Sequence, residues 1–212
     1  MPSNPPFRRS PLALAILALL ESGPLHPYGI QRLIKQWGKD RVVNVTDRTS
    51  LYRMITRLEA AGLIEVADTE RSEGYPERTL YRLTDAGLTI SRIWLAEIIS
   101  TPRNEFPEFP AGLSFLVLLP PADAEDLLEQ RRSRLARRLA ELDAELATET
   151  EGHGVPRIAL IENEYLRTMT HAELQWITVT LAALRDGSFT WDRAELEPMV
   201  AAARTEQPAE RR

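Results

Sequence analysis

The segment TSLYRMITRLEAAGLIE (49–65) separates polar from apolar side chains at helical spacing. At roughly 100° per residue, Leu51, Met54, Ile55 and Leu58 fall on one side of a helical wheel. The opposite side carries Thr49, Tyr52, Arg53 and Thr56, flanked by Arg48 and Arg57. Hydroxyl groups, a planar ring and guanidinium groups on one exposed face can hydrogen-bond to base edges in a major groove and bind phosphates.

The charge around this helix favours a polyanionic partner. Residues 30–57 contain seven basic and two acidic residues, although the whole chain has a formal net charge of -5. Residues 1–101 contain 13 basic and 11 acidic residues, whereas residues 102–212 contain 13 and 20. The negative charge therefore lies mostly in the C-terminal part. Exposed arginine and tyrosine on a helix are ordinarily only a solvated surface, so the interpretation depends on the surrounding elements.

Those elements follow the order of a winged helix-turn-helix. Helix-start signals occur at Ser10-Pro11, Pro27, Thr46-Asp47 and Thr84-Asp85, and Gly62 is suited to end the third helix. Between the third and fourth helices, LIEVAD and RTLYRL predict two strands around a turn-rich tip with Gly74 and Pro76. The apolar run LALAILALL (12–20) is too short for a bilayer, which needs about 20 residues. We therefore expect a cytoplasmic protein with no membrane partner.

The C-terminal half predicts a helical hairpin. Pro102, Pro107 and Pro110 suggest a linker, and the glycines of EGHG (151–154) divide two long helices. The seam of the first of these helices consists of Leu128, Leu135, Leu139, Leu142 and Leu146. The predicted fold is mainly α, with an N-terminal winged helix-turn-helix, a two-stranded wing and a C-terminal helical dimerisation domain. The predicted domains are 1–101 (DNA binding), 102–112 (Pro-rich linker), 113–186 (dimerisation) and 187–212 (polar tail).

Four segments of the chain resemble the PadR family of transcriptional regulators, in its longer type with a helical C-terminal domain. They are SGPLHPYGI, TSLYRMITRLEAAGLIE, EGYPERTLYRLTDAG and FPAGLSFLVLLPP. The resemblance extends from Pro11 to about Asp186 and implies a homodimer that binds double-stranded operator DNA through two winged helices. It also implies repression that a small molecule relieves.

The resemblance and the helical wheel together give a set of candidate site residues. Tyr28, near the start of the second helix, resembles a backbone-phosphate contact of the family, and the wing would contribute Arg71 and Arg78, interleaved with Glu70, Glu73 and Glu77. The expected DNA-binding residues are Tyr28, Arg48, Thr49, Tyr52, Arg53, Thr56, Arg57, Arg71 and Arg78. Trp94 on the fourth helix is a candidate for a small aromatic effector, with ordinary core packing as the alternative.

Two other classes of function remain open at this point. A winged helix can bind protein instead of DNA, because the fold alone does not decide its partner. An enzyme is disfavoured, because no nucleophile with its base, Gly-rich phosphate loop or metal cluster is visible. The chain has no cysteine and only three histidines, so we expect no cofactor and no metal site.

Overall fold

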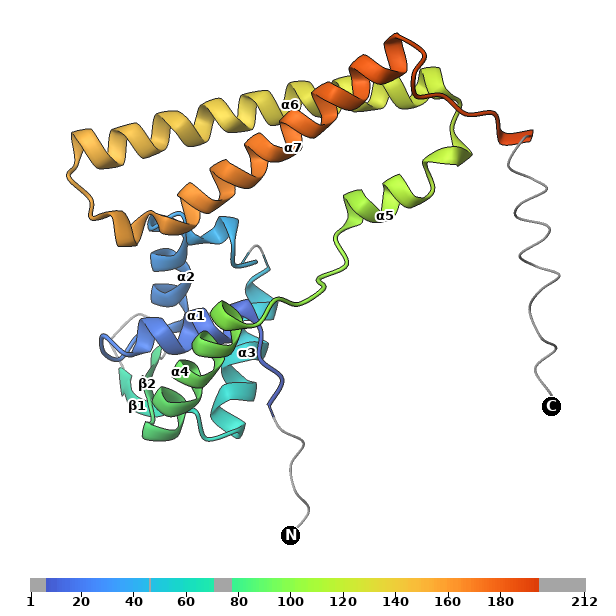
Figure 1. Cartoon of the computed structure of the whole chain (residues 1–212). Helices are drawn as coiled ribbons and strands as arrows, with labels where there is room; N and C mark the ends of the chain where they lie inside the picture. Colours follow the sequence, from blue (N-terminus) through green and yellow to red (C-terminus); the bar gives the residue numbers. More distant parts are fainter. Residues whose placement is uncertain (1–6, 46, 71–77, 195–212) are drawn as a thin grey trace, which may run out of the picture. The chain divides into compact units, whose positions relative to one another are not determined.

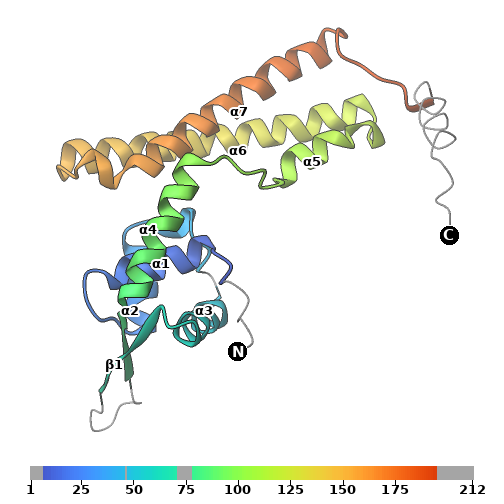
Figure 2. The same cartoon turned by 60° about the horizontal axis from the view of Figure 1, so that its bottom comes forward.

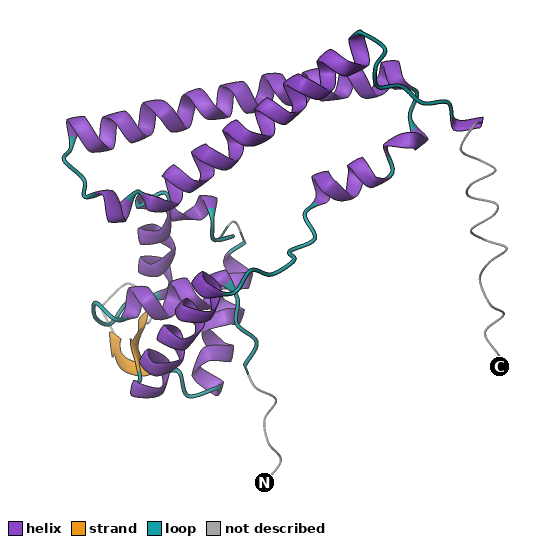
Figure 3. Cartoon of the chain, in the orientation of Figure 1, coloured by secondary structure: helices purple, strands orange, loops and turns teal. Residues whose placement is uncertain are grey.

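The structure, a computed structural model, describes residues 7–45, 47–70 and 78–194. The chain divides into two compact units, Met1–Asn104 and Glu105–Arg212, and each is described by itself. Helices dominate both, and the strands of the described part form one two-stranded sheet in the N-terminal unit (Figure 3). The predicted architecture, a winged helix followed by a helical C-terminal part, is confirmed.

The N-terminal unit is built around a central apolar helix. Its elements are α1 (Pro11–Leu20), α2 (Pro27–Gln36), the short turn η1 (Lys39–Arg41), α3 (Arg48–Ala60), β1 (Ile64–Glu70), β2 (Arg78–Leu83) and α4 (Asp85–Ser100) (Figure 1). Ser10 starts α1 by accepting a hydrogen bond from the Ala13 N–H at 3.2 Å. Helix α1 contacts α2, α3, α4 and β2, and its Ile16 and Leu17 are fully buried. The other helices therefore take their positions from α1.

The wing is tied to the helices by its second strand. β1 and β2 pair antiparallel, with Ile64 opposite Leu83 and Val66 opposite Tyr81, and the register shifts between Val66 and Asp68. The backbone of Tyr81 also exchanges two 3.0 Å hydrogen bonds with Leu25, in the loop between α1 and α2. This bridge, which the sequence pattern did not predict, fixes the base of the wing.

The junction between the wing and α4 is closely packed. The Thr84 hydroxyl lies 2.8 Å from the Gly62 carbonyl and 3.0 Å from the Leu63 carbonyl. The same hydroxyl caps α4 by accepting the Gly87 N–H at 3.0 Å. A β-carbon added to Gly87 would lie only 2.0 Å from the Leu63 carbonyl oxygen. Glycine at this position therefore allows α4 to approach the start of β1.

The C-terminal unit is a long antiparallel helix pair with short elements at its ends. These elements are α5 (Glu108–Ser114), η2 (Leu116–Leu118), α6 (Pro121–Ala147), the π-helical turn η3 (Thr148–Gly152), η4 (Arg157–Ala159) and α7 (Ile161–Arg185) (Figure 2). Leu128 on α6 and both Ile177 and Leu181 on α7 form its buried centre, and Leu142 is also fully buried. The predicted helical hairpin thus has the expected leucines Leu128 and Leu142 at its seam.

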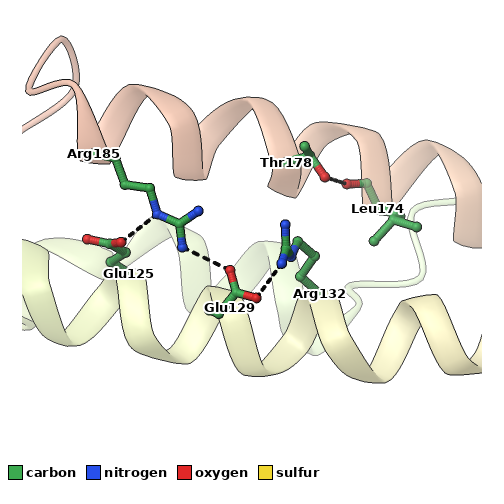
Figure 4. A network of polar contacts seen from close by, with 6 residues as sticks. All are labelled: Glu125, Glu129, Arg132, Leu174, Thr178 and Arg185. Atoms are coloured by element: carbon green, nitrogen blue, oxygen red, sulfur yellow. Dashed lines mark hydrogen bonds and ion pairs between the residues drawn. The ribbon is translucent and has the colours of Figure 1, made fainter.

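Ion pairs connect the two long helices near the end of α7. Arg185 donates to Glu125 at 2.7 Å and to Glu129 at 2.9 Å, and Glu129 also accepts from Arg132 at 2.6 Å (Figure 4). The Arg185 hydrogen bond is the main cause of the lowered pKa of the Glu129 carboxyl. Arg132 and Glu129 thus form an ion pair within α6, and Arg185 connects it to α7.

Helix α5 begins inside the segment that the sequence predicted as a linker, 102–112. Pro107 is its N-cap and Pro110 lies in its first turn, where a proline removes no helical hydrogen bond. Prolines that suggested a linker are thus compatible with a short helix. None of the helices in the described ranges is long and apolar enough to cross a membrane.

We expect Gly87→Ala to destabilise the protein by about 1–3 kcal/mol, because the new methyl group would overlap the Leu63 carbonyl. The free energy of unfolding from urea denaturation of the full chain is the measurement. Gly29→Ala in α2 is the matched control, since its β-carbon would meet only Leu25 Cδ2 at 3.8 Å. That control is expected to gain about 0.5–1 kcal/mol. Equal stability of the two variants would contradict the close approach of α4 to β1.

Candidate nucleic-acid interface

Helix α3 buries one face and exposes the other, as its sequence predicts. Leu51, Ile55 and Leu58 are 0–2 % exposed and belong to the core around α1. The candidate residues Thr49, Tyr52, Arg53, Thr56 and Arg57 are all exposed. The Thr56 hydroxyl donates to the Tyr52 carbonyl at 3.2 Å, so its proton is engaged within the helix. Arg53, Arg57 and the Tyr52 ring, which is 52 % exposed, are the large side chains among these candidates.

The first turn of α3 is fixed by Asp47. Its carboxylate accepts the Thr49 N–H at 2.9 Å and the Ser50 hydroxyl at 3.0 Å. These bonds, with the Thr49 backbone bond first, lower the pKa of the Asp47 carboxyl below its usual 3.8. Because the pKa of Asp47 is lower in the folded protein, the ionised cap contributes its full stability above the usual value of 3.8. That stability is lost as the pH falls through the lowered pKa. The cap is therefore complete at neutral pH and orients the exposed face of α3.

One flank of α3 faces the wing. Burial is the main cause of the raised pKa of the Tyr81 hydroxyl on β2, and the neighbouring Glu59 and Tyr52 on α3 raise it further. Tyr81 is also the residue whose backbone bridges to Leu25. Tyr52 therefore lies on the side of α3 nearest the wing.

Helix α2 adds a second polar surface. Tyr28, Gln31, Arg32, Lys35 and Gln36 line a hollow of about 570 Å³. Tyr28 lies in the first turn of α2 and is 62 % exposed, so its side chain is open to a partner. Arg32 and Lys35 contribute to the local positive charge of residues 30–57, but the helical pattern of α3 did not identify them as site residues. Their spacing of three, which places them on one helix face, is the signal that could have identified them.

Gln31 connects this hollow to α3. It is one of two buried polar residues of the described chain, and its side-chain amide donates to the Val45 carbonyl at 3.1 Å. Val45 is itself buried and stands shortly before the N-cap of α3. The bond therefore holds the loop between α2 and α3. A single glutamine in an amphipathic helix gave no signal of this role in the sequence.

The remaining candidates differ in their surroundings. The guanidinium carbon of Arg57 lies 5.0 Å from the centre of the Phe7 ring. Arg48 is the first residue of α3 and Arg78 the first of β2, but their side chains, like the whole of Arg71, lie outside the described residues. Trp94 is 5 % exposed, belongs to the core around α1 and stacks on Phe7 with ring centroids 5.6 Å apart. The structure thus brings Tyr52, Arg53 and Thr56 together on α3 and places Trp94 inside the unit.

The order of three helices, a two-stranded wing and a fourth helix defines a winged-helix domain. Residues 16–90 match the model of the transcriptional regulator PadR-like family. The chain therefore carries a PadR-like domain, which confirms the resemblance in its sequence, and the α6–α7 pair fits the longer type of that family. No curated protein sequence gives a significant match.

Solved structures share this fold at low sequence identity. PadR of Bacillus subtilis in complex with operator DNA is 23% identical, with a TM-score of 0.62 over 82% of this chain and 98% of that chain. The same protein in complex with p-coumaric acid is 19% identical, with a TM-score of 0.59 over 84% and 99%. The virulence activator AphA of Vibrio cholerae is 18% identical, with a TM-score of 0.62 over 82% and 98%. At these identities the comparison establishes the fold.

We expect Gln31→Leu to cost about 1–3 kcal/mol, because the buried Val45 carbonyl loses its hydrogen-bond donor. Chemical denaturation gives the difference in unfolding free energy. Gln36→Leu, an exposed position on the same helix, is the control and should stay within about 0.5 kcal/mol of the parent. If both substitutions have the same small effect, the bond to Val45 does not hold the loop.

Proposed function

We propose that this protein is a sequence-specific DNA-binding transcriptional regulator that acts as a homodimeric repressor. The observation that carries the proposal is the outward polar face of α3, with Tyr52, Arg53 and Thr56 exposed above a buried apolar face. Arginine can donate two hydrogen bonds to the edge of one guanine, and tyrosine can hydrogen-bond to a phosphate or a base edge. Arg32 and Lys35 on α2 add positive charge for the DNA backbone.

The competing hypothesis is a winged helix that binds protein. The two hypotheses differ in how strongly salt weakens binding. DNA affinity falls steeply with salt, because each phosphate neutralised by a protein cation releases counterions from the DNA. Selection of bound fragments from genomic DNA by the purified protein, beginning with the promoter of its own gene, tests the proposal. A reporter under the selected promoter then separates repression from activation. Failure to enrich any DNA, at low and moderate salt alike, would leave the protein-binding module as the better hypothesis.

The dimer is proposed from apolar surface that is exposed within the described residues. On α7 one stripe at helical spacing is exposed by 45–71 %, and it consists of Ile161, Tyr165, Met169, Trp176 and Val179. Surfaces of this kind on a water-soluble chain mark sites of association. A second copy is the partner that suits a family of DNA-binding dimers, because two α3 helices can then contact two half-sites.

Release by a small aromatic effector completes the proposal. Bacillus subtilis PadR has been solved with p-coumaric acid, so a related fold accepts a molecule of this class. Trp94 was the candidate contact, and its ring is stacked with Phe7. An effector that reaches the Trp94 ring on that side has to displace Phe7 first. It releases DNA only if it binds the conformation unsuited to DNA more tightly than the suited one.

We expect Arg53→Ala to weaken binding to the selected DNA. If Arg53 reads a guanine edge, the loss is about 1–3 kcal/mol and specificity relaxes at one base pair. If it binds only phosphate, the loss is equal on random DNA and the salt slope falls by about one. Fluorescence anisotropy over a salt series distinguishes the two results. Arg92→Ala, which removes an exposed arginine paired with Glu21 at 3.0 Å, is the control. An unchanged affinity for Arg53→Ala would remove α3 from the interface.

The dimer is expected to protect two half-sites about one helical turn, or roughly 10 bp, apart. Val179→Asp places a charge in the exposed α7 stripe and should shift the protein to monomer in sedimentation and reduce the footprint. Thr178→Asp is the matched control, since Thr178 is exposed beside the stripe and is not part of it. A dimer that survives Val179→Asp at micromolar concentration would show that another surface holds the two copies together.

A further inference from the structure

Phe7 joins the N-terminal segment to two helices that lie far from it in the sequence. Its ring stacks on Trp94 of α4, with centroids 5.6 Å apart and planes at 26°. The guanidinium carbon of Arg57 on α3 lies 5.0 Å from the centre of the same ring. In Figure 1 the described start of the chain runs beside α3. One aromatic side chain thus contacts both helices.

Two neighbouring contacts restrict the backbone that carries Phe7. Arg9 forms an ion pair with Glu97 of α4, and the side chain of Arg9 is only 12 % exposed. Ser10 is the N-cap of α1. Because both anchors lie within three residues of Phe7, the ring has little freedom to leave Trp94.

The positive charge of Arg57 has no acidic partner among the described residues. Within the described part of the chain it makes no ion pair and no side-chain hydrogen bond, and its contact is the Phe7 ring. A guanidinium that lies over a ring keeps its positive charge and can still donate N–H groups from its edge. On the helical wheel of α3, Arg57 stands beside Arg53 at the flank of the exposed face, which suits a contact to the DNA backbone.

We propose that Phe7 is a positioning residue for DNA binding, which holds the Arg57 guanidinium ready for a phosphate beside α3. This inference rests on the proposed function. A free arginine loses side-chain freedom when it binds a phosphate, whereas a guanidinium already restrained on a ring loses less. Phe7 therefore contributes to affinity through Arg57 without contacting the DNA. The contribution is independent of base sequence, because phosphates carry none.

A double-mutant cycle on the full chain tests the inference. Phe7→Leu keeps an apolar side chain against Trp94 but removes the aromatic ring, and Phe7→Tyr keeps the ring. Affinity is measured by anisotropy over a salt series, with a duplex selected by the wild-type protein and with a random duplex. We expect Phe7→Leu to weaken binding to both about two- to fivefold, from the strength of an exposed cation–π contact, and Phe7→Tyr to retain wild-type affinity. Arg57→Ala should lower the salt slope by about one.

The decisive comparison is Phe7→Leu in the Arg57→Ala background, where no further loss is expected. An equal loss in both backgrounds would overturn the inference, because Phe7 would then act only through the stability of the fold. A higher DNA affinity of Phe7→Leu than of the wild type would overturn the inference as well, since the ring would then be competing with DNA for Arg57.

A measurement without DNA separates this inference from the proposed function. The ring current of Phe7 should shift the side-chain NMR signals of Arg57 in the wild-type protein, and Phe7→Leu should abolish the shift. If the wild type binds neither duplex, the proposed function fails and the positioning role fails with it, whether or not the shift is seen. If the wild type binds both duplexes and the shift is absent, only the positioning role is overturned.

Discussion

The candidate interface depends on the burial of the apolar face of α3 against α1. Leu51, Ile55 and Leu58 are in the core, and α1 contacts α2, α3 and α4. Burial of each such side chain contributes about 1.5–3 kcal/mol. Rotation of α3 about its axis would expose this face and bury arginine, so the rotation is strongly disfavoured. The outward direction of Arg53 is thus a consequence of core packing.

Three polar contacts then fix the start of α3 and the segments on either side of it. Asp47 fixes its first turn, Gln31 holds the loop before it, and the Leu25–Tyr81 bridge keeps the wing beside its flank. Each satisfies backbone groups that would otherwise lack a partner within the protein. Core packing gives the orientation of the face, and these local bonds give the accuracy that base contacts need.

The sequence predicted the elements well because their signals are local. Ser10, Asp47 and Thr84 are N-caps as expected, and helical periodicity identified the buried and exposed faces of α3. Three of the missed features depend on contacts between distant residues. Phe7 meets Trp94 across the fold, Tyr81 meets Leu25, and Gly87 meets the Leu63 carbonyl. Helix α5 was missed for another reason, because prolines can indicate either a linker or the first turn of a helix.

The surroundings of Trp94 relate the effector hypothesis to the packing of the winged helix. From the sequence, core packing was the more common role for a residue such as Trp94 and an effector contact the less common one, and the structure places it in the core with Phe7 on its ring. A tryptophan covered in this way can respond to a ligand only through displacement of its cover. Phe7 also contacts Arg57, so such a displacement changes the surroundings of a basic side chain on α3. The energy of the Phe7 contacts then limits the coupling between an effector at Trp94 and DNA binding at Arg57. A ligand can shift the equilibrium between the packed and displaced positions of Phe7 only by its difference in affinity for the two. Of the two Phe7 contacts, only the one with Arg57 bears on DNA, and an exposed cation–π contact is worth about 0.5–1 kcal/mol, so this route alone changes DNA affinity by about two- to fivefold.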